Sequence, residues 1–200
     1  DNGVDDNGDG LVDCEDNYCQ LQEACIVIPA DPSTRAPTGD ATELTNFHDS
    51  IRFLYEGDDP IIRGVNPGAI MPNRAVVIRG KILDVDGEPL AGVRARIAGQ
   101  PALGYTYSRA DGMIDLVGNA GEPITVRYDT ATHLPVDRKV NPNPNSFAQA
   151  ATIVLTPVDE KITSIDVSRG GQIAAGSQVD DADGQRTLQI YFEPDTLAQV

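Results

Sequence analysis

Residues 75–97 read AVVIRGKILDVDGEPLAGVRARI and carry the clearest structural pattern in the chain. Small or apolar residues occupy alternate positions in both halves of this stretch: Val76, Ile78, Gly80 and Ile82, then Val93, Ala95 and Ile97. A period of two is typical of a strand with one buried face. Between the halves, residues 85–92 contain Gly and Pro, which favour a tight connection. We therefore predict two strands joined as a β-hairpin.

Further segments with strand character follow at 105–107, 113–116, 124–128 and 151–155. Turn residues separate them at intervals of about ten residues, as in antiparallel sandwiches. The composition agrees, since 33 of 200 residues are Gly or Pro (19 and 14) and only 5% are aromatic. These features favour turns and short strands over a helix bundle, so we predict a mainly β fold.

Acidic residues are concentrated at the start of the chain. The formal net charge is −16, and residues 1–34 hold nine of the 31 acidic residues but no Lys or Arg. Binding to nucleic acid needs clustered basic residues, and none of the three Lys lies near another. No apolar run approaches the ~18 residues of a membrane span, and no leader pattern opens the sequence. We expect a mature fragment or a part of something larger.

The acidic start fits a calcium-loop template. Residues 5–16 read DDNGDGLVDCED, with a Gly at loop position 6. The oxygen ligands expected from this spacing are Asp5, Asn7, Asp9, the Leu11 carbonyl, Asp13 and Asp16. A Ca²⁺ ion would offset the repulsion among these carboxylates. A disordered acidic arm is the alternative. Because amphipathic helices do not flank the loop on both sides, we expect a structural site, not a sensor.

Three cysteines, Cys14, Cys19 and Cys25, lie within the first 25 residues. Such crowding is typical of small secreted frameworks. Three single bridges are possible among them, and each leaves one thiol over. With few apolar side chains before residue 30, this arm is expected to depend on metal and disulfides for its stability.

The next segment divides into a linker and a short helix. Residues 31–42 are rich in Pro, Ser, Thr and Gly, which indicates a linker. Within 45–55, apolar residues at spacings of four and three predict a helix packed on the following domain, with Thr45 as its cap: Phe47, Ile51, Leu54 and Tyr55.

Motifs of catalysis are missing from the sequence, which contains no GxSxG elbow, HExxH pair or phosphate loop. We expect no enzyme here, with His48 a packing or surface residue and His133 a loop residue. Two acidic clusters are interpreted as turns in preference to cation sites: Asp84, Asp86 and Glu88, and Asp180, Asp181 and Asp183.

The order of these pieces resembles the teneurins. DNGVDDNGDGLVDCEDNYC, NFHDSIRFLYEG, AVVIRGKILDVDGEPLAGVRARI and GYTYSRADGMIDLV follow one another as do the Cys-rich segment, short helix and transthyretin-like domain that precede the YD-repeat shell. The resemblance implies a seven-stranded Greek-key sandwich, related to carboxypeptidase regulatory domains, without catalysis. It also implies turn roles for five residues: Gly87, Pro89, Gly92, Asp111 and Gly112. A further Cys upstream in the family is the implied partner of the odd cysteine.

Four segments follow from this interpretation. They are an arm at 1–30, a linker with helix at 31–74, a sandwich at 75–158 and an incomplete β element at 159–200. The last segment resembles the lead into the shell of bacterial YD-repeat (Rhs-type) proteins. It includes a predicted strand at 186–192. If its partner strands lie outside these residues, it can add to another sheet edge, so self-association or filament growth is expected.

The expected function is a non-catalytic, calcium-binding scaffold of a secreted or cell-surface teneurin-like protein, used in adhesion or assembly. Its partners would be proteins, a second copy bound through sheet edges, or the rest of a YD-repeat chain, with no nucleic acid and no membrane span. Two alternatives stay open. The region could mount or plug a bacterial polymorphic YD-repeat toxin, or it could be an accessory domain of a secreted hydrolase.

Overall fold

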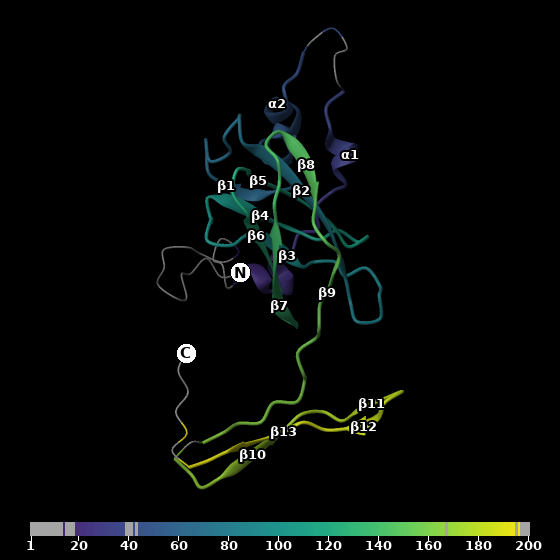
Figure 1. The fold of residues 1–200 in the computed structure, drawn as a ribbon, viewed down its shortest axis with the longest axis vertical. Helices are drawn as coiled ribbons and strands as arrows, with labels where there is room; N and C mark the ends of the chain where they lie inside the picture. Colours follow the sequence, from purple (N-terminus) through teal and green to yellow (C-terminus); the bar gives the residue numbers. More distant parts are fainter. Residues whose placement is uncertain are drawn as a thin grey trace. The chain divides into compact units, whose positions relative to one another are not determined.

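The computed structural model describes residue 14 and residues 19–38, 42, 44–166, 168–194 and 196. The chain divides into two compact units, Asp1–Pro157 and Val158–Val200. The first unit contains a two-sheet β-sandwich, and the second contains short hairpins (Figure 1).

Two sheets form the sandwich of the first unit. The large sheet has the order β1 (Arg63–Val65), β4 (Leu103–Tyr107), β3 (Arg94–Ile97), β6 (Ile124–Thr130) and β7 (His133–Val140). The small sheet has the order β5 (Met113–Asn119), β2 (Ala75–Leu83) and β8 (Ser146–Gln149), and β9 (Ile153–Val154) also pairs with β2. All pairs are antiparallel except β8 and β9, which run parallel to β2. The predicted mainly β sandwich is confirmed; β2 to β8 are its seven longer strands, and the short β1 and β9 extend it.

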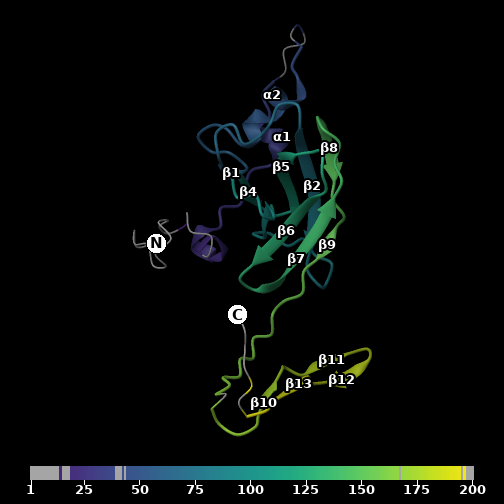
Figure 2. The ribbon, with the colours of Figure 1, turned by 60° about the vertical axis from the view of Figure 1, so that its left-hand side comes forward.

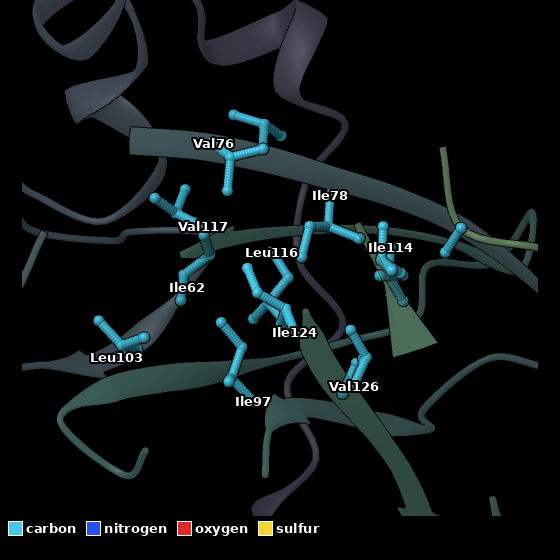
Figure 3. Close-up of a cluster of buried hydrophobic side chains, with 14 of the residues drawn as sticks. Ile62, Val76, Ile78, Ile97, Leu103, Ile114, Leu116, Val117, Ile124 and Val126 are labelled. Carbon is cyan, nitrogen blue, oxygen red and sulfur yellow. The ribbon is translucent and has the colours of Figure 1, made fainter. Parts of the chain in front are cut away.

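The core fills the space between the two sheets. Figure 3 shows Val76, Ile78, Ile114 and Leu116 from the small sheet meeting Ile97, Leu103, Ile124 and Val126 from the large one. Ile78, Ile114, Leu116 and Val126 are fully buried. The alternation seen in the sequence therefore marks the inward face of each strand.

The predicted hairpin between 76–82 and 93–97 is wrong. Strands β2 and β3 belong to different sheets. Both edges of β2 are already paired, with β5 on one side and with β8 and β9 on the other, so no edge is left for β3. The connection instead crosses between the sheets. It begins with a turn in which Asp84 Oδ1 accepts hydrogen bonds from the Asp86 and Glu88 N–H groups, which confirms the turn interpretation of these acids.

The segment before the sandwich contains two short α-helices. Helix α1 (Pro32–Arg35) lies where we expected a linker, and Asp31 caps it by accepting a hydrogen bond from the Ser33 N–H. Helix α2 (Phe47–Ile51) continues into a 3₁₀ turn at Arg52–Leu54. Its cap is Asn46, not Thr45 as expected, because the Asn46 side chain accepts from the Asp49 N–H. Ile51 and Leu54 are buried against the sandwich, as predicted.

The second unit pairs its own strands. Strand β10 (Gln172–Ala175) pairs with β13 (Gln189–Phe192), and β11 (Val179–Asp181) pairs with β12 (Gly184–Arg186). The expectation that the strand at 186–192 lacks a partner in this chain is therefore wrong. The turn between β11 and β12 contains Asp183, and Asp181 pairs with Arg186, so the acidic cluster is part of a hairpin, as interpreted.

We expect Gly112→Ala to destabilise the sandwich much more than Gly87→Ala. Both glycines have positive φ, +75° and +85°, which costs about 1–3 kcal/mol for other residues. A Cβ on Gly112 would also lie 2.4 Å from the Ile82 carbonyl oxygen, whereas nothing lies within 4 Å of one on Gly87. Urea unfolding measures both variants. If both variants lost the same free energy of unfolding, the close approach at Gly112 would be contradicted.

In the second unit, Asp159 provides a pH test. Its carboxylate accepts hydrogen bonds from the Lys161 N–H, the Ser177 N–H and the Ser177 hydroxyl. These bonds, the Lys161 N–H first, lower the pKa of Asp159 from 3.8 to about 2. The stabilisation is therefore present above pH 3.8 and lost as the pH falls through about 2. Carboxyl NMR titration should show the low midpoint, and Asp159→Asn should remove the transition from the Ser177 amide signal. A midpoint near 3.8 would contradict the bonds.

Candidate functional site

A disulfide closes the described part of the N-terminal arm. It joins Cys14 and Cys25, one of the three bridges left open by the sequence. Cys19, which is half-buried, lies outside this bridge and begins a 3₁₀ turn at Cys19–Leu21. A second 3₁₀ turn, Glu23–Cys25, ends at the disulfide. These turns bring the arm against the large sheet.

The expected calcium ligands Asp5, Asn7, Asp9, Leu11, Asp13 and Asp16 lie outside the described residues. Within the described ranges, no three His, Cys, Asp or Glu side chains gather in a way that could hold a metal ion. The calcium loop therefore stays a prediction.

Gln20 attaches the arm to the sandwich through a buried charged cluster. Arg94 on β3 donates two hydrogen bonds to Asp129 on β6, Nε to Oδ1 at 2.8 Å and Nη2 to Oδ2 at 3.0 Å. The remaining Arg94 nitrogen, Nη1, donates to the Gln20 side-chain oxygen at 2.9 Å. Tyr107 on β4 donates its hydroxyl to the Gln20 carbonyl at 2.6 Å. We call these four residues the arm clasp.

Burial makes the arm clasp sensitive to the loss of any member. Gln20, Arg94 and Asp129 are 6%, 3% and 8% exposed. A buried ion pair is tolerated when its remaining polar groups are satisfied, and Gln20 satisfies Arg94 here. Burial also raises the pKa of the Tyr107 phenol, so the hydroxyl stays protonated and able to donate. The arm thus covers the guanidinium, and the guanidinium positions the arm.

Sequence reasoning missed the arm clasp. Arg94 occupies an outward position on its strand, where a charged residue is normally solvated. The arm covers that outward face, so the side chain is buried. Gly92 contributes to the fit, since a Cβ there would lie 3.3 Å from Ile26 Cγ2. The available signal was the alternation of Arg94 and Arg96 along one strand and the presence of Asp129 near the end of β6, but it does not identify Gln20.

A groove of about 580 Å³ lies on the opposite side of the sandwich, between helices α1 and α2 and the outer face of the small sheet. On its floor, the buried carboxylate of Asp115 accepts from Arg79 Nε at 2.7 Å and from Arg109 Nη1 at 2.6 Å. Arg79 also lies over the Phe147 ring, 4.5 Å from its centroid. The charges on the floor are therefore engaged with one another.

The two histidines show no catalytic arrangement in the described residues. His48 Nε2 lies 3.1 Å from the Tyr55 hydroxyl and Nδ1 lies 3.2 Å from Asp49, which is a packing role as expected. His133 is the first residue of strand β7, so its expected place in a loop is wrong. The helices in the described part of the chain are all too short to cross a membrane.

Together, the two sheets and the docked disulfide arm define a transthyretin-like β-sandwich module. Residues 70–155 match the family "Teneurin TTR-like domain", and this part of the chain belongs to that family. The resemblance to teneurins is therefore confirmed for the sandwich.

Teneurins also match most of the rest of the chain. Zebrafish (Danio rerio) Teneurin-3 is 36% identical over 178 residues, covering 83% of this chain and 6% of that protein. Mouse (Mus musculus) Teneurin-4 is 38% identical over 177 residues, again 83% of this chain and 6% of that protein. The chain thus spans about 6% of the length of these relatives.

Among solved structures, 3-chlorocatechol 1,2-dioxygenase from Rhodococcus opacus 1CP aligns over 48% of this chain and 64% of its own, with 12% identity and a TM-score of 0.35. A score this low is no evidence of a shared activity.

We expect Arg94→Ala to cost about 3 kcal/mol of unfolding free energy, because it removes both hydrogen bonds to the buried Asp129 carboxylate and leaves it with the more distant Arg96, at 3.6 Å. Gln20→Ala should cost about 1–3 kcal/mol, since it removes the charge-assisted hydrogen bond that Arg94 donates to the Gln20 side chain. Chemical denaturation measures both.

The matched control is Arg127→Ala on the same sheet. Arg127 pairs with Asp137 at 3.5 Å, and both side chains are well exposed (39% and 50%). An exposed pair contributes about 0–1 kcal/mol. If Arg94→Ala costs no more than Arg127→Ala, the arm clasp does not stabilise the chain.

Proposed function

We propose that this chain is a non-catalytic, calcium-binding scaffold within a teneurin-like YD-repeat protein, serving adhesion or assembly outside the cell. The observation that carries the proposal is the arm clasp, by which a disulfide-bonded arm is fixed to the sandwich through Gln20, Arg94 and Asp129. A rigid connection between arm and sandwich holds neighbouring parts of a long chain in a set orientation. This is a positioning task, and it requires no reacting groups.

Two observations support an extracellular or cell-surface location. The disulfide between Cys14 and Cys25 is of a kind that persists in oxidising compartments. The relatives that match over most of the chain are teneurins. Their similarity favours the scaffold over the mounting region of a bacterial toxin and over an accessory domain of a secreted hydrolase.

The partners that we propose are the remaining parts of a larger YD-repeat chain and other proteins that meet the sheet edges. The small share of each relative covered by this chain supports the first. Self-association through a sheet edge is also proposed. The strand predicted at 186–192 is not an unpaired one, since its residues 189–192 form β13 and pair with β10.

Calcium should bind the arm with a dissociation constant of about 10⁻⁴ to 10⁻³ M, the usual range of extracellular calcium modules. Isothermal titration of the chain with CaCl₂ measures this. Asp9→Ala removes a carboxylate from the centre of the loop and should abolish the heat signal. It should also release the arm and destabilise the sandwich about as much as Gln20→Ala does, because the bond from Arg94 to Gln20 is then lost while the sandwich keeps its own core.

The control is Asp183→Ala, which removes an acid from the turn between β11 and β12. It should leave calcium binding intact. An absence of calcium binding at millimolar concentration would overturn the metal part of the proposal, and an equal loss with Asp183→Ala would show that the effect is one of overall charge.

A further inference from the structure

Three arginines form a row across the outer face of the large sheet. The strand registers place them next to one another: Arg63 on β1 is paired with Tyr105 on β4, which is paired with Arg96 on β3, and Arg96 is paired with Arg127 on β6. Directly opposite residues project on the same side of a sheet. Because the neighbouring Val126 points into the core, these side chains point outward. We call Arg63, Arg96 and Arg127 the arginine row.

The arginine row lacks the close partners that other arginines have. Four of the twelve arginines donate no hydrogen bond within the described part of the chain, and three of these four form the row. The fourth, Arg169, belongs to the second unit. The carboxylates beside Arg63, Arg96 and Arg127 lie at 3.6, 3.6 and 3.5 Å. Arg96 Nε is buried and has no hydrogen-bond acceptor among the described residues. Since a buried donor without an acceptor is unfavourable, an added acceptor would stabilise the row.

The outer face of the large sheet carries more bases than acids. Its strands direct five basic side chains and two acidic ones outward: Arg63, Arg94, Arg96, Arg127 and Lys139, with Asp129 and Asp137. The chain as a whole has the opposite balance, with 15 basic and 31 acidic residues. This face therefore attracts carboxylates, although the molecule has a net charge of −16.

The segment that precedes Cys14 matches this face in charge and in length. Residues 1–13 contain five Asp and no Lys or Arg. The arm is already fixed to the face, because Gln20 accepts from Arg94, which lies two residues, or about 7 Å, from Arg96 on the same strand. Figures 1 and 2 show the purple turns of the arm beside the large sheet. A segment of this length spans up to about 45 Å, whereas the five strands of the sheet span about 19 Å.

We propose that the arginine row binds the acidic segment of residues 1–13 of the same chain. Attachment at Cys14, which the disulfide holds to Cys25, gives the segment an effective concentration on the order of millimolar near the row. A separate acidic chain lacks this advantage and is also repelled by the net charge of −16. The inference goes beyond the proposed function and does not rest on calcium, because Asp1 and Asp6 are not among the expected calcium ligands.

Side-chain NMR of the full chain tests the contact. Asp1→Asn combined with Asp6→Asn removes two carboxylates from the segment and leaves every expected calcium ligand in place. Exchange of the Arg96 and Arg127 Nε–H protons with water should become about three- to tenfold faster, the effect of losing one or two exposed ion pairs. Asp183→Asn, in the turn between β11 and β12, is the control and should leave both signals unchanged.

Cleavage of the segment provides the reciprocal test. An endoprotease that cuts before Asp should act on residues 1–13 about three- to tenfold faster in Arg127→Gln than in the unaltered chain. The Arg127 side chain is 39% exposed, so this substitution leaves the core intact. Arg169→Gln is the matched control, since it removes the same charge from the second unit, and it should leave the rate unchanged. Circular dichroism melts establish that each variant is folded.

Three results would overturn the proposal. The arginine signals could be unchanged when Asp1 and Asp6 are replaced, Arg169→Gln could accelerate cleavage as much as Arg127→Gln, or protection of the segment could rise with protein concentration. The last result would mean that the row holds the acidic segment of a second copy. Isothermal titration of the variant lacking the Asp1 and Asp6 carboxylates with CaCl₂ reports on the metal site separately, because its expected ligands remain. Failure of the row contact and failure of calcium binding are therefore distinguishable.

Discussion

Strand β2 is buried on both faces, and much of the structure follows from this constraint. Ala75 to Ile78 are fully buried, and both edges of the strand are paired. Its inward face requires the large sheet as cover. Its outward face requires a second layer, which helix α2 and the following 3₁₀ turn supply through Ile51 and Leu54. A strand with no free edge and no free face cannot also form a hairpin with β3, so the chain crosses to the other sheet.

The outer face of the large sheet is also covered by another segment, but here the buried groups are polar. Its outward face carries Arg94 and Asp129, whose burial is tolerated because the arm supplies Gln20. Where helix α2 contributes apolar area, the arm contributes a hydrogen-bond acceptor. Apolar packing by helix α2 tolerates small shifts, whereas the hydrogen bond from Arg94 requires Gln20 to lie at one position. The neighbouring disulfide Cys14–Cys25 helps to fix that position.

The sequence predicts well what depends on local pattern. Alternation located the core strands, and the turn at Asp84 was predicted from the Gly and Pro residues that follow it; in the structure, the Asp84 side chain accepts hydrogen bonds from the Asp86 and Glu88 N–H groups. Sequence reasoning failed where contacts between segments that are distant in the sequence determine the structure. Strands β7 and β8 were missed, since β7 is mostly exposed and contains a proline, and β8 has little apolar alternation. The arm clasp was missed for a related reason. Nothing local to Arg94 shows that a residue 74 positions earlier covers it.

Charge is distributed unevenly along the chain: the acidic first 34 residues oppose contact with other copies, whereas the uncharged residues 140–158 do not. The acids of the first 34 residues repel other copies unless a cation neutralises them. The run of Asp137, Arg138 and Lys139 protects β7, and the charge then stops at Val140 and returns at Asp159. The described sandwich has four edge strands, β1 and β7 in the large sheet and β5 and β8 in the small one, and β7 and β8 differ most in charge. Pairing at an edge is prevented by charge, by proline or by cover from another segment, and β8 itself contains neither charge nor proline. The asymmetry between the two edges is therefore a property of the sandwich itself, independent of how the arm is stabilised.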